Sequence, residues 1–471
     1  MNTNNELDRI VQGFLKDRVV APPRPKLLRD SLDNTATTPQ TRRRFMGRWL
    51  DRDEGARRGT ADHDHPPPGD RRSRLMYSAT AVTAAVAIAA LAVNVIDTTP
   101  TQPSAGAVTT HVVAADDSGD FSTIAEAVAA AAEGDTVLVR PGTYVEAIVI
   151  DKDITLAGDG PREDIVISAP EDGPTVDFGM GVQRFEWPYT LLVDDTQADV
   201  RELTFAGAET AVVVDGGSPS LSDLIFDGNE FGLLIESGST ATVTENLMTG
   251  GGGIELADYS EPVIEGNVLR GGPSIVGSMG DGGVVRDNVL TDPVNGIGLG
   301  GIGVDEPTNA LIERNTITGA SGYAISTSTL LGAGAPVIRE NTISGSRNGI
   351  QVGALSGDAG SADGGSDVAT AQPLVSGNDI SAELVAISVS WTDAEVVDNT
   401  VHDSFNGIVL FGGGSPELMG NEVAVDGYGI DIGANTSPSV DGNSVCGGNG
   451  SIKIHDDSTP SMGENATCDD A

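Results

Sequence analysis

Cysteine, histidine and aromatic residues are scarce in this sequence. Of 471 residues, two are cysteine, five are histidine and 4% are aromatic, whereas 61 are glycine. The first 75 residues contain no cysteine, which excludes a zinc site of the His/Cys type there. Only three histidines follow residue 97, so no Ser–His–Asp arrangement is indicated. The composition suits a thin repeat with a narrow aliphatic core better than a globular enzyme with a thick one.

Positive charge is also scarce, but only in the larger part of the chain. Residues 97–471 hold 11 Lys and Arg against 58 Asp and Glu, whereas residues 1–75 hold 16 against 11. Because an acidic body repels nucleic acid and anionic membranes, no nucleic-acid partner is predicted. A polysaccharide lyase needs a basic group for proton abstraction, and this part of the chain has few basic residues to provide one. The acidity suits a salty exterior, cation binding or simple solubility.

Charge is absent altogether from Leu75 to Ile96, over 22 positions. A helix of that length crosses about 30 Å of hydrocarbon, so residues 76–96 are predicted to be a transmembrane helix. Arg71, Arg72 and Arg74 precede it and no Lys or Arg follows until Arg140. The positive-inside rule then places the N-terminus in the cytoplasm and the rest of the chain outside the cell membrane. A cleaved signal peptide is the alternative, although the long preceding segment argues against it.

The residues before and after this apolar stretch have different compositions. Residues 5–18 and 27–32 predict short helices, and residues 42–74 are an Arg-rich tether. We therefore expect a cytoplasmic segment (1–75), of which residues 1–35 dock a cytoplasmic protein or fold back locally. The other predicted parts are the transmembrane helix (76–96), a Thr-, Pro- and Ser-rich linker (97–108) and a repeat domain (109–471).

The repeat domain is marked by asparagines that recur about every 22 residues. Each of the first nine has an aliphatic residue three positions before it and an apolar residue two positions after it, and a third apolar run comes about nine positions after the asparagine. A fixed period of this length is typical of stacked repeats. The asparagines are Asn246, Asn267, Asn288, Asn315, Asn341, Asn378, Asn399, Asn421, Asn443 and Asn465.

Three short strands in each 22-residue coil predict an all-β fold, a parallel β-helix whose coils lie about 4.8 Å apart. Asparagine tolerates the left-handed conformation of a tight corner, and stacked amides can bond one another. A structural role is therefore expected for every member of the ladder. Two positions before four successive asparagines, the outward-facing residues Glu265, Arg286, Glu313 and Arg339 alternate in sign and predict a row of ion pairs.

Residues 116–160 carry the most specific motifs. They include Asp116-Asp117-Ser118-Gly119-Asp120-Phe121, Pro141-Gly142-Thr143-Tyr144 and Ile154-Thr155-Leu156-Ala157-Gly158. This stretch resembles the start of the pectin lyase-like superfamily, and of pectin methylesterases within it. The resemblance implies a right-handed parallel β-helix. Thr123 and Glu126 fit a capping box, which predicts a helix that covers the first coil.

The catalytic motifs of that superfamily are missing. Thr175-Val176-Asp177-Phe178-Gly179 resembles an aspartate motif of the methylesterases, but it lies too early and its partner motifs are absent. Asp194-Asp195 reads as an isolated acidic pair. The sequence therefore leaves open whether the chain is an enzyme.

A candidate binding site is indicated where the coils carry insertions. The extra residues fall at one corner in three consecutive coils, at residues 303–309, 327–335 and 354–372. Loops displayed on a rigid scaffold commonly carry function. Aromatic residues beside them could stack on sugar rings, and the acids could bond hydroxyls or hold a cation such as Ca²⁺. The predicted carbohydrate-binding residues are Trp391, Phe411, Asp305, Glu306, Asp358, Asp363, Asp367 and Asp393.

The two cysteines, Cys446 and Cys468, stand one coil apart, each three residues after a ladder asparagine. Stacking places their Cα atoms about 5 Å apart, so a disulfide is predicted in the last coil.

These observations favour an exported, membrane-anchored β-helix that binds a polysaccharide or cell-wall glycan, or acts as a structural module. Two alternatives stay open. One is a polysaccharide lyase, hydrolase or epimerase with an unrecognised site. The other is the extracellular sensor of a membrane-tethered regulator. No cofactor is predicted, with Ca²⁺ as the open alternative.

Overall fold

The computed structural model describes residues 108–180, 183–280, 282–300, 309–327, 335–353 and 372–468, with only the backbone for residues 177–180 and 183–186. The predicted cytoplasmic segment, transmembrane helix and linker up to residue 107 lie outside these residues. Within the described ranges, no helix is long and apolar enough to cross a membrane.

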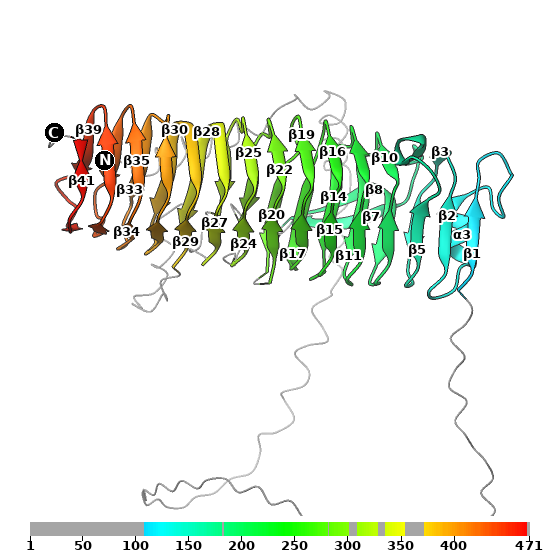
Figure 1. Cartoon of the computed structure of the whole chain (residues 1–471). Coiled ribbons are helices and arrows are strands. Elements are labelled where there is room, and N and C mark those ends of the chain that lie inside the picture. Colours follow the sequence, from blue (N-terminus) through cyan, green and yellow to red (C-terminus); the bar gives the residue numbers. More distant parts are fainter. Residues whose placement is uncertain are drawn as a thin grey trace, which may run out of the picture. The chain divides into compact units, whose positions relative to one another are not determined.

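The described residues form a parallel β-helix, as the repeat predicts (Figure 1). The first strands of successive coils pair in parallel and build a 15-stranded sheet, which we call the first face. Its strands are β1 (Thr110–Val113), β2 (Thr136–Val139), β5 (Thr155–Gly158), β9 (Asp199–Arg201), β12 (Ser220–Ser222), β15 (Thr242–Thr244), β18 (Val263–Glu265), β21 (Val284–Arg286), β24 (Leu311–Glu313), β27 (Val337–Arg339), β29 (Leu374–Ser376), β31 (Glu395–Val397), β34 (Glu417–Met419), β37 (Ser439–Asp441) and β40 (Ser461–Met462).

The second and third strands of the coils form a second and a third face, which are joined into one 26-stranded sheet. They are joined because β28 (Thr342–Gly353) and β30 (Asp379–Ser390) each run through both faces. The other strands of the second face are β3 (Gly142–Val145), β6 (Ile165–Ser168), β10 (Thr204–Ala206), β13 (Ile225–Asp227), β16 (Leu247–Thr249), β19 (Val268–Arg270), β22 (Val289–Thr291), β25 (Thr316–Thr318), β32 (Thr400–His402), β35 (Glu422–Val425), β38 (Ser444–Gly447) and β41 (Ala466–Thr467). Those of the third face are β4 (Ile148–Ile150), the end of β8 (Gln183–Asp194), β11 (Thr210–Asp215), β14 (Phe231–Glu236), β17 (Ile254–Ser260), β20 (Ile275–Met279), β23 (Ile297–Leu299), β26 (Tyr323–Ser326), β33 (Asn406–Phe411), β36 (Tyr428–Ile432) and β39 (Gly450–Ile454).

Aliphatic side chains fill the inside of the coils in vertical rows. On the first face, the middle residue of each three-residue strand is buried, as in Val243, Ile264, Val285 and Ile312. Each coil contributes only a few such residues and buries them against the coils before and after it. Stability therefore depends on stacking rather than on any single coil.

The asparagine ladder lies inside the corner between the first and second faces. Asn315 Nδ2 donates to Asn341 Oδ1 (3.0 Å) and the backbone N–H of Asn315 donates to the same oxygen (3.0 Å). The same pair of bonds is repeated from Asn246 to Asn465. This confirms the predicted bonding of amides along the axis.

The expectation that the asparagines themselves take the left-handed conformation was wrong. The residue before each asparagine from Asn246 to Asn443 does so instead, with φ of 57° at Glu245, 53° at Arg314 and 55° at Glu340. The reason is that the amide must point into the coil to reach its neighbours, so the corner is turned one residue earlier. Other coils have glycine at this position, such as Gly266 and Gly377, which takes positive φ without steric cost.

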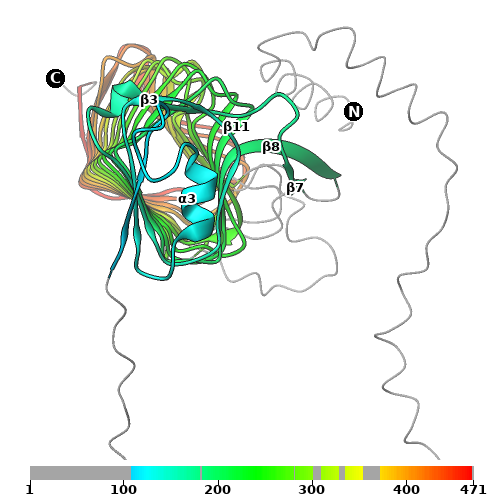
Figure 2. The same cartoon turned by 90° about the vertical axis from the view of Figure 1, so that its right-hand side faces the viewer.

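The predicted capping helix is present as α3 (Ile124–Ala130), which lies across the N-terminal end of the coils (Figure 2). Thr123 Oγ1 accepts a bond from Glu126 N (3.3 Å), as the capping box predicts. The remaining free amides at the helix start are bonded by a residue that the sequence did not point to. The Glu146 carboxylate accepts from Ile124 N (2.9 Å) and Ala125 N (2.8 Å).

Asp135 ties the first two coils together at this end. Its carboxylate accepts bonds from Ala132 N (2.9 Å), His111 Nε2 (3.0 Å) and Thr109 N (2.8 Å). These three donors, with Ala132 the strongest, lower the pKa of Asp135 to about 2.

We expect Asp135→Asn to lower the unfolding midpoint of the protein at neutral pH. A carboxyl group with a lowered folded-state pKa stabilises the fold above its ordinary pKa, about 4, and loses that effect as the pH falls through about 2. The gap between wild type and variant in thermal or urea melts should therefore narrow between pH 4 and pH 2. A gap that does not change over that range would contradict this assignment.

Two elements remain. One is the short 3₁₀ helix η1 (Arg162–Asp164). The other is an antiparallel hairpin, in which β7 (Thr175–Met180) pairs with the first half of β8. The hairpin projects from the coils (Figure 2), and nothing in the repeat pattern predicts it.

Candidate functional site

The predicted site lies where third-face strands end and the chain turns to the next coil, which we call the loop corner. Three of the eight predicted residues, Trp391, Asp393 and Phe411, lie within the described residues, at or just after the ends of β30 and β33. The other five, Asp305, Glu306, Asp358, Asp363 and Asp367, lie outside the described residues.

Trp391 lies on the backbone of the following coil. A Cβ atom at Gly412 would overlap the indole ring, and one at Gly413 would lie 3.3 Å from Trp391 Cε3. Both glycines also have positive φ, 86° and 131°, so other residues would be strained there. Although one side of the ring is covered in this way, 41% of the Trp391 surface stays exposed. The arrangement presents an aromatic surface held by rigid backbone.

Phe411 continues this surface one coil further along. It pairs in register with Ser390, the residue before Trp391, and is itself 41% exposed. Asp393 has a more structural role than predicted, because its Oδ1 accepts a 2.6 Å bond from Ser415 N and ties two successive turns. The structure thus places the two aromatic residues on adjacent coils, offset by one residue along the strands.

The same corner carries a row of carboxylates in earlier coils. Asp194, Asp215 and Glu236 are in register at the ends of β8, β11 and β14, one coil apart. The interpretation of Asp194-Asp195 as an isolated pair was therefore wrong. Its missing partners could have been found from the sequence, because the three residues are separated by 21 positions, one coil, and follow equivalent strands.

The hairpin packs beside this row. Trp187 stacks on Phe231 with ring centroids 4.2 Å apart, and Tyr189, Val213, Leu234 and Ala257 form a buried cluster outside the main core. Burial raises the pKa of Tyr189, and the negative charge of Asp194 adds to the rise. The hairpin therefore shields part of the outer surface of the third face from water.

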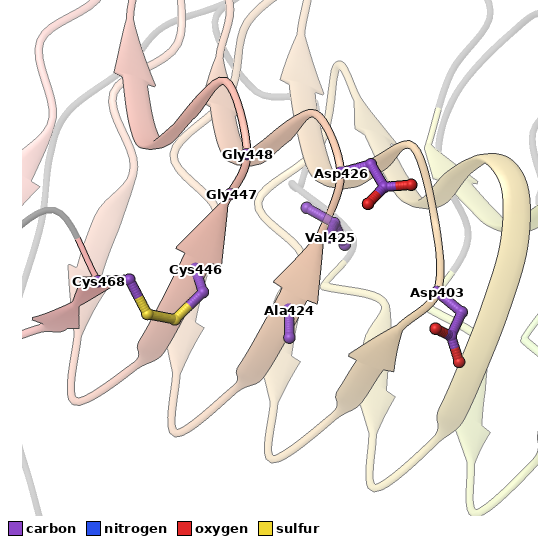
Figure 3. Close-up of a pocket in the computed structure, with 8 residues that line it drawn as sticks. All are labelled: Asp403, Ala424, Val425, Asp426, Cys446, Gly447, Gly448 and Cys468. Atoms are coloured by element: carbon purple, nitrogen blue, oxygen red, sulfur yellow. A yellow bond between two sulfur atoms is a disulfide. The ribbon is translucent and has the colours of Figure 1, made fainter.

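A shallow depression of about 390 Å³ lies far from the loop corner, near the last coils (Figure 3). It is lined by Asp403, Ala424, Val425, Asp426, Cys446, Gly447, Gly448 and Cys468. The cysteines form a disulfide with Cα atoms 5.1 Å apart. At the rim, His402 bonds Asp403 (2.8 Å) and Asp379 (3.0 Å), and these carboxylates, Asp403 foremost, raise the pKa of His402 against the effect of burial.

A metal centre is not indicated in the parts of the chain that the structure describes. Among them, no three or more His, Cys, Asp or Glu side chains are grouped so as to hold a metal ion. The acids predicted as Ca²⁺ ligands lie mostly outside those residues, so Ca²⁺ binding stays a prediction.

Comparison with known proteins identifies the class of this fold. The sequence matches the right-handed β-helix region family over residues 191–359 and 293–445, which together span more than half of the chain. The chain therefore belongs to that family. No curated protein matches the sequence.

Several solved structures share this architecture at low sequence identity. The catalytic domain of a GH87 α-1,3-glucanase is 13% identical. The match covers 77% of this chain and 70% of that domain's chain, with a TM-score of 0.49. The A-module of the Azotobacter vinelandii mannuronan C-5 epimerase AlgE6 is 17% identical. The match covers 73% of this chain and 94% of the A-module, with a TM-score of 0.40. The Erwinia chrysanthemi pectin methylesterase PemA is 15% identical. The match covers 44% of this chain and 79% of the PemA chain, with a TM-score of 0.34. These are similarities of fold and carry no inference about activity.

Proposed function

We propose that the loop corner binds polysaccharide, with Trp391 and Phe411 stacking against sugar rings. The observation that carries this proposal is the placement of the Trp391 indole on the Gly412 and Gly413 backbone, with 41% of its surface exposed. An aromatic ring already fixed by backbone contacts loses little freedom when a ligand stacks on it. Aromatics are 4% of this chain, so two exposed on adjacent coils are a distinctive surface.

The ligand class follows from charge. Asp and Glu outnumber Lys and Arg by 58 to 11 beyond residue 97. A glycan with carboxylate or sulfate groups would be repelled, so an uncharged polysaccharide is the expected partner.

Trp391→Ala should abolish retention of the full chain on an immobilised uncharged polysaccharide, because the stacking surface is removed. Retention is measured by affinity electrophoresis or pull-down, with circular dichroism to verify that the β-helix is intact. Phe405→Ala is the matched control, since Phe405 is 51% exposed but lies on another corner, before β33. Equal retention of wild type and Trp391→Ala would remove this corner as the site.

A second candidate function, polysaccharide cleavage, is favoured by the carboxylate row. Glycoside hydrolysis uses two carboxyl groups about 5–9.5 Å apart. Residues one and two coils apart along a β-helix are separated by about 4.8 and 9.6 Å, which brackets that range. If this activity exists, Asp215→Asn should stop the release of reducing ends while leaving retention unchanged. Absence of product from every retained polysaccharide would exclude it.

For the cellular setting, we propose that residues 76–96 anchor the chain in the cell membrane with the β-helix outside. The uncharged stretch and its preceding arginines support this orientation. In that setting the β-helix would meet cell-wall or environmental glycans, and residues 1–35 would face cytoplasmic proteins.

A further inference from the structure

Within the described part of the chain, two aromatic residues have a left-handed backbone conformation, and both lie at the loop corner. One is Trp391, with a φ of 53°, and the other is Tyr259 near the end of β17, with a φ of 54°. Each stands four residues before the next first-face strand, which begins at Glu395 after Trp391 and at Val263 after Tyr259. The two residues therefore occupy the same position in their coils.

The fold itself does not require an aromatic ring at this position. The left-handed conformation is unfavourable for bulky side chains and is adopted most readily by glycine, asparagine and aspartate. Five other coils have such a residue four positions before a first-face strand, and all five have positive φ: Asp195, Gly216, Gly238, Gly413 and Asn435. Residues held in an unfavourable backbone conformation occur preferentially at ligand-binding and active sites.

Tyr259 also presents as much of its surface to solvent as Trp391 does. The exposed fractions are 42% for Tyr259 and 41% for Trp391. Asp258, the neighbour of Tyr259, is exposed as well, so its carboxylate can accept bonds from sugar hydroxyl groups and repels acidic ligands. Tyr259 thus combines the aromatic surface and the acidic surroundings of the site at Trp391.

The two rings are aligned along the solenoid. The third-face strands β17, β20, β23, β26, β28 and β30 pair one after another, so five coil steps separate Tyr259 from Trp391. At about 4.8 Å for each step, the two residues are about 24 Å apart. On the other side of Tyr259, β17 pairs with β14, which ends at Glu236 in the carboxylate row.

We infer that Tyr259 is a second sugar-binding subsite, and that one polysaccharide chain lies along the loop corner from Trp391 to Tyr259. This inference rests on the proposed function, because Trp391 has to hold the chain. An extended chain advances by about one sugar unit for each coil, so about six units reach from one ring to the other. The end of the chain at Tyr259 then lies one coil from Glu236, beside the carboxylates considered for cleavage.

Two subsites on one rigid scaffold act together only on a ligand that reaches both. A long chain held at Trp391 meets Tyr259 at a high effective concentration, whereas a short oligosaccharide occupies the Trp391 subsite alone. The affinity should therefore rise at least about tenfold once the oligosaccharide is long enough to reach Tyr259.

Calorimetric titration of the full chain with uncharged gluco- and manno-oligosaccharides, in a length series on either side of about six units, tests this inference. Tyr259→Gly should bind short oligosaccharides as wild type does and should lose the rise in affinity for long ones. Glycine takes positive φ without strain, and circular dichroism verifies that the variant is folded. Tyr259→Phe is the matched control, which should keep the rise because the ring stays in place.

The outcomes separate this inference from the proposed function. An affinity that depends on Trp391 but not on the length of the oligosaccharide would overturn the second subsite alone. A wild-type chain that binds none of the oligosaccharides would overturn both. A length effect that Tyr259→Gly retains would also overturn the second subsite. So would loss of short-oligosaccharide binding in that variant, because a short chain held at Trp391 does not reach Tyr259.

Discussion

Asn341→Ala should lower the free energy of unfolding by about 3–5 kcal/mol, since it leaves buried polar groups without partners. Asn341 Oδ1 accepts two bonds from Asn315, and its Nδ2 donates to Ile312 O (3.1 Å) and Asn378 Oδ1 (3.0 Å). Alanine removes all four at a residue that is 1% exposed. The backbone N–H of Asn315 then has no acceptor at this position, and Ile312 O loses this donor.

The matched control is Asn449→Ala, at an exposed asparagine outside the ladder. That change should stay within about 0.5 kcal/mol of wild type. Urea unfolding followed by circular dichroism measures both. Similar midpoints for Asn341→Ala and wild type would mean that the ladder contributes little, and that aliphatic stacking alone sets the stability of the coils.

Reduction of the Cys446–Cys468 disulfide should destabilise the last coils by about 3 kcal/mol, the value expected for a closed loop of this length. The bond spans 22 residues and joins β38 to the coil of β41, where no described strand follows on the second face. Hydrogen exchange should show faster opening of residues 444–468 after reduction, with little change near β2.

The double variant Cys446→Ser, Cys468→Ser supplies the control for the reductant. It should behave like the reduced protein and should not respond to dithiothreitol. Two free thiols in each chain of non-reduced protein purified from an oxidising compartment would contradict the predicted bridge.

The parallel β-helix could be predicted because its determinants are local and repeated. The aliphatic residue three positions before each asparagine, as in Val243 and Ile264, becomes the buried centre of a first-face strand. The capping box at Thr123 likewise depends on residues three positions apart. Patterns of this kind are read directly from spacing.

Features that depend on the register of distant residues were missed. The Asp194, Asp215 and Glu236 row is visible only after the third-face strands have been aligned. Glu313 was expected to face solvent, yet it is 3% exposed because Arg314 and Arg339 close over it. Burial alone would raise the pKa of Glu313, but the two guanidinium groups outweigh that effect and lower it.

At the candidate site, the sequence indicated the corner and the aromatic residues but not how they are held. The contact of Trp391 with Gly412 and Gly413 crosses from one coil to the next, and no residue pattern near Trp391 reports it. Asp393 was predicted as a ligand-binding residue because it is acidic and lies in a loop. In the structure its carboxylate accepts a bond from Ser415 N and links two successive turns.

The most direct measurement of the central proposal is binding of the full chain to a glycan array that includes uncharged, uronate-containing and sulfated polysaccharides. Trp391→Ala and Phe405→Ala are applied in parallel. We predict that wild type and Phe405→Ala bind the same uncharged polysaccharide, that charged glycans are not bound, and that Trp391→Ala binds none. A wild-type chain that binds no glycan, or binds one equally well without the Trp391 side chain, would contradict the proposed function.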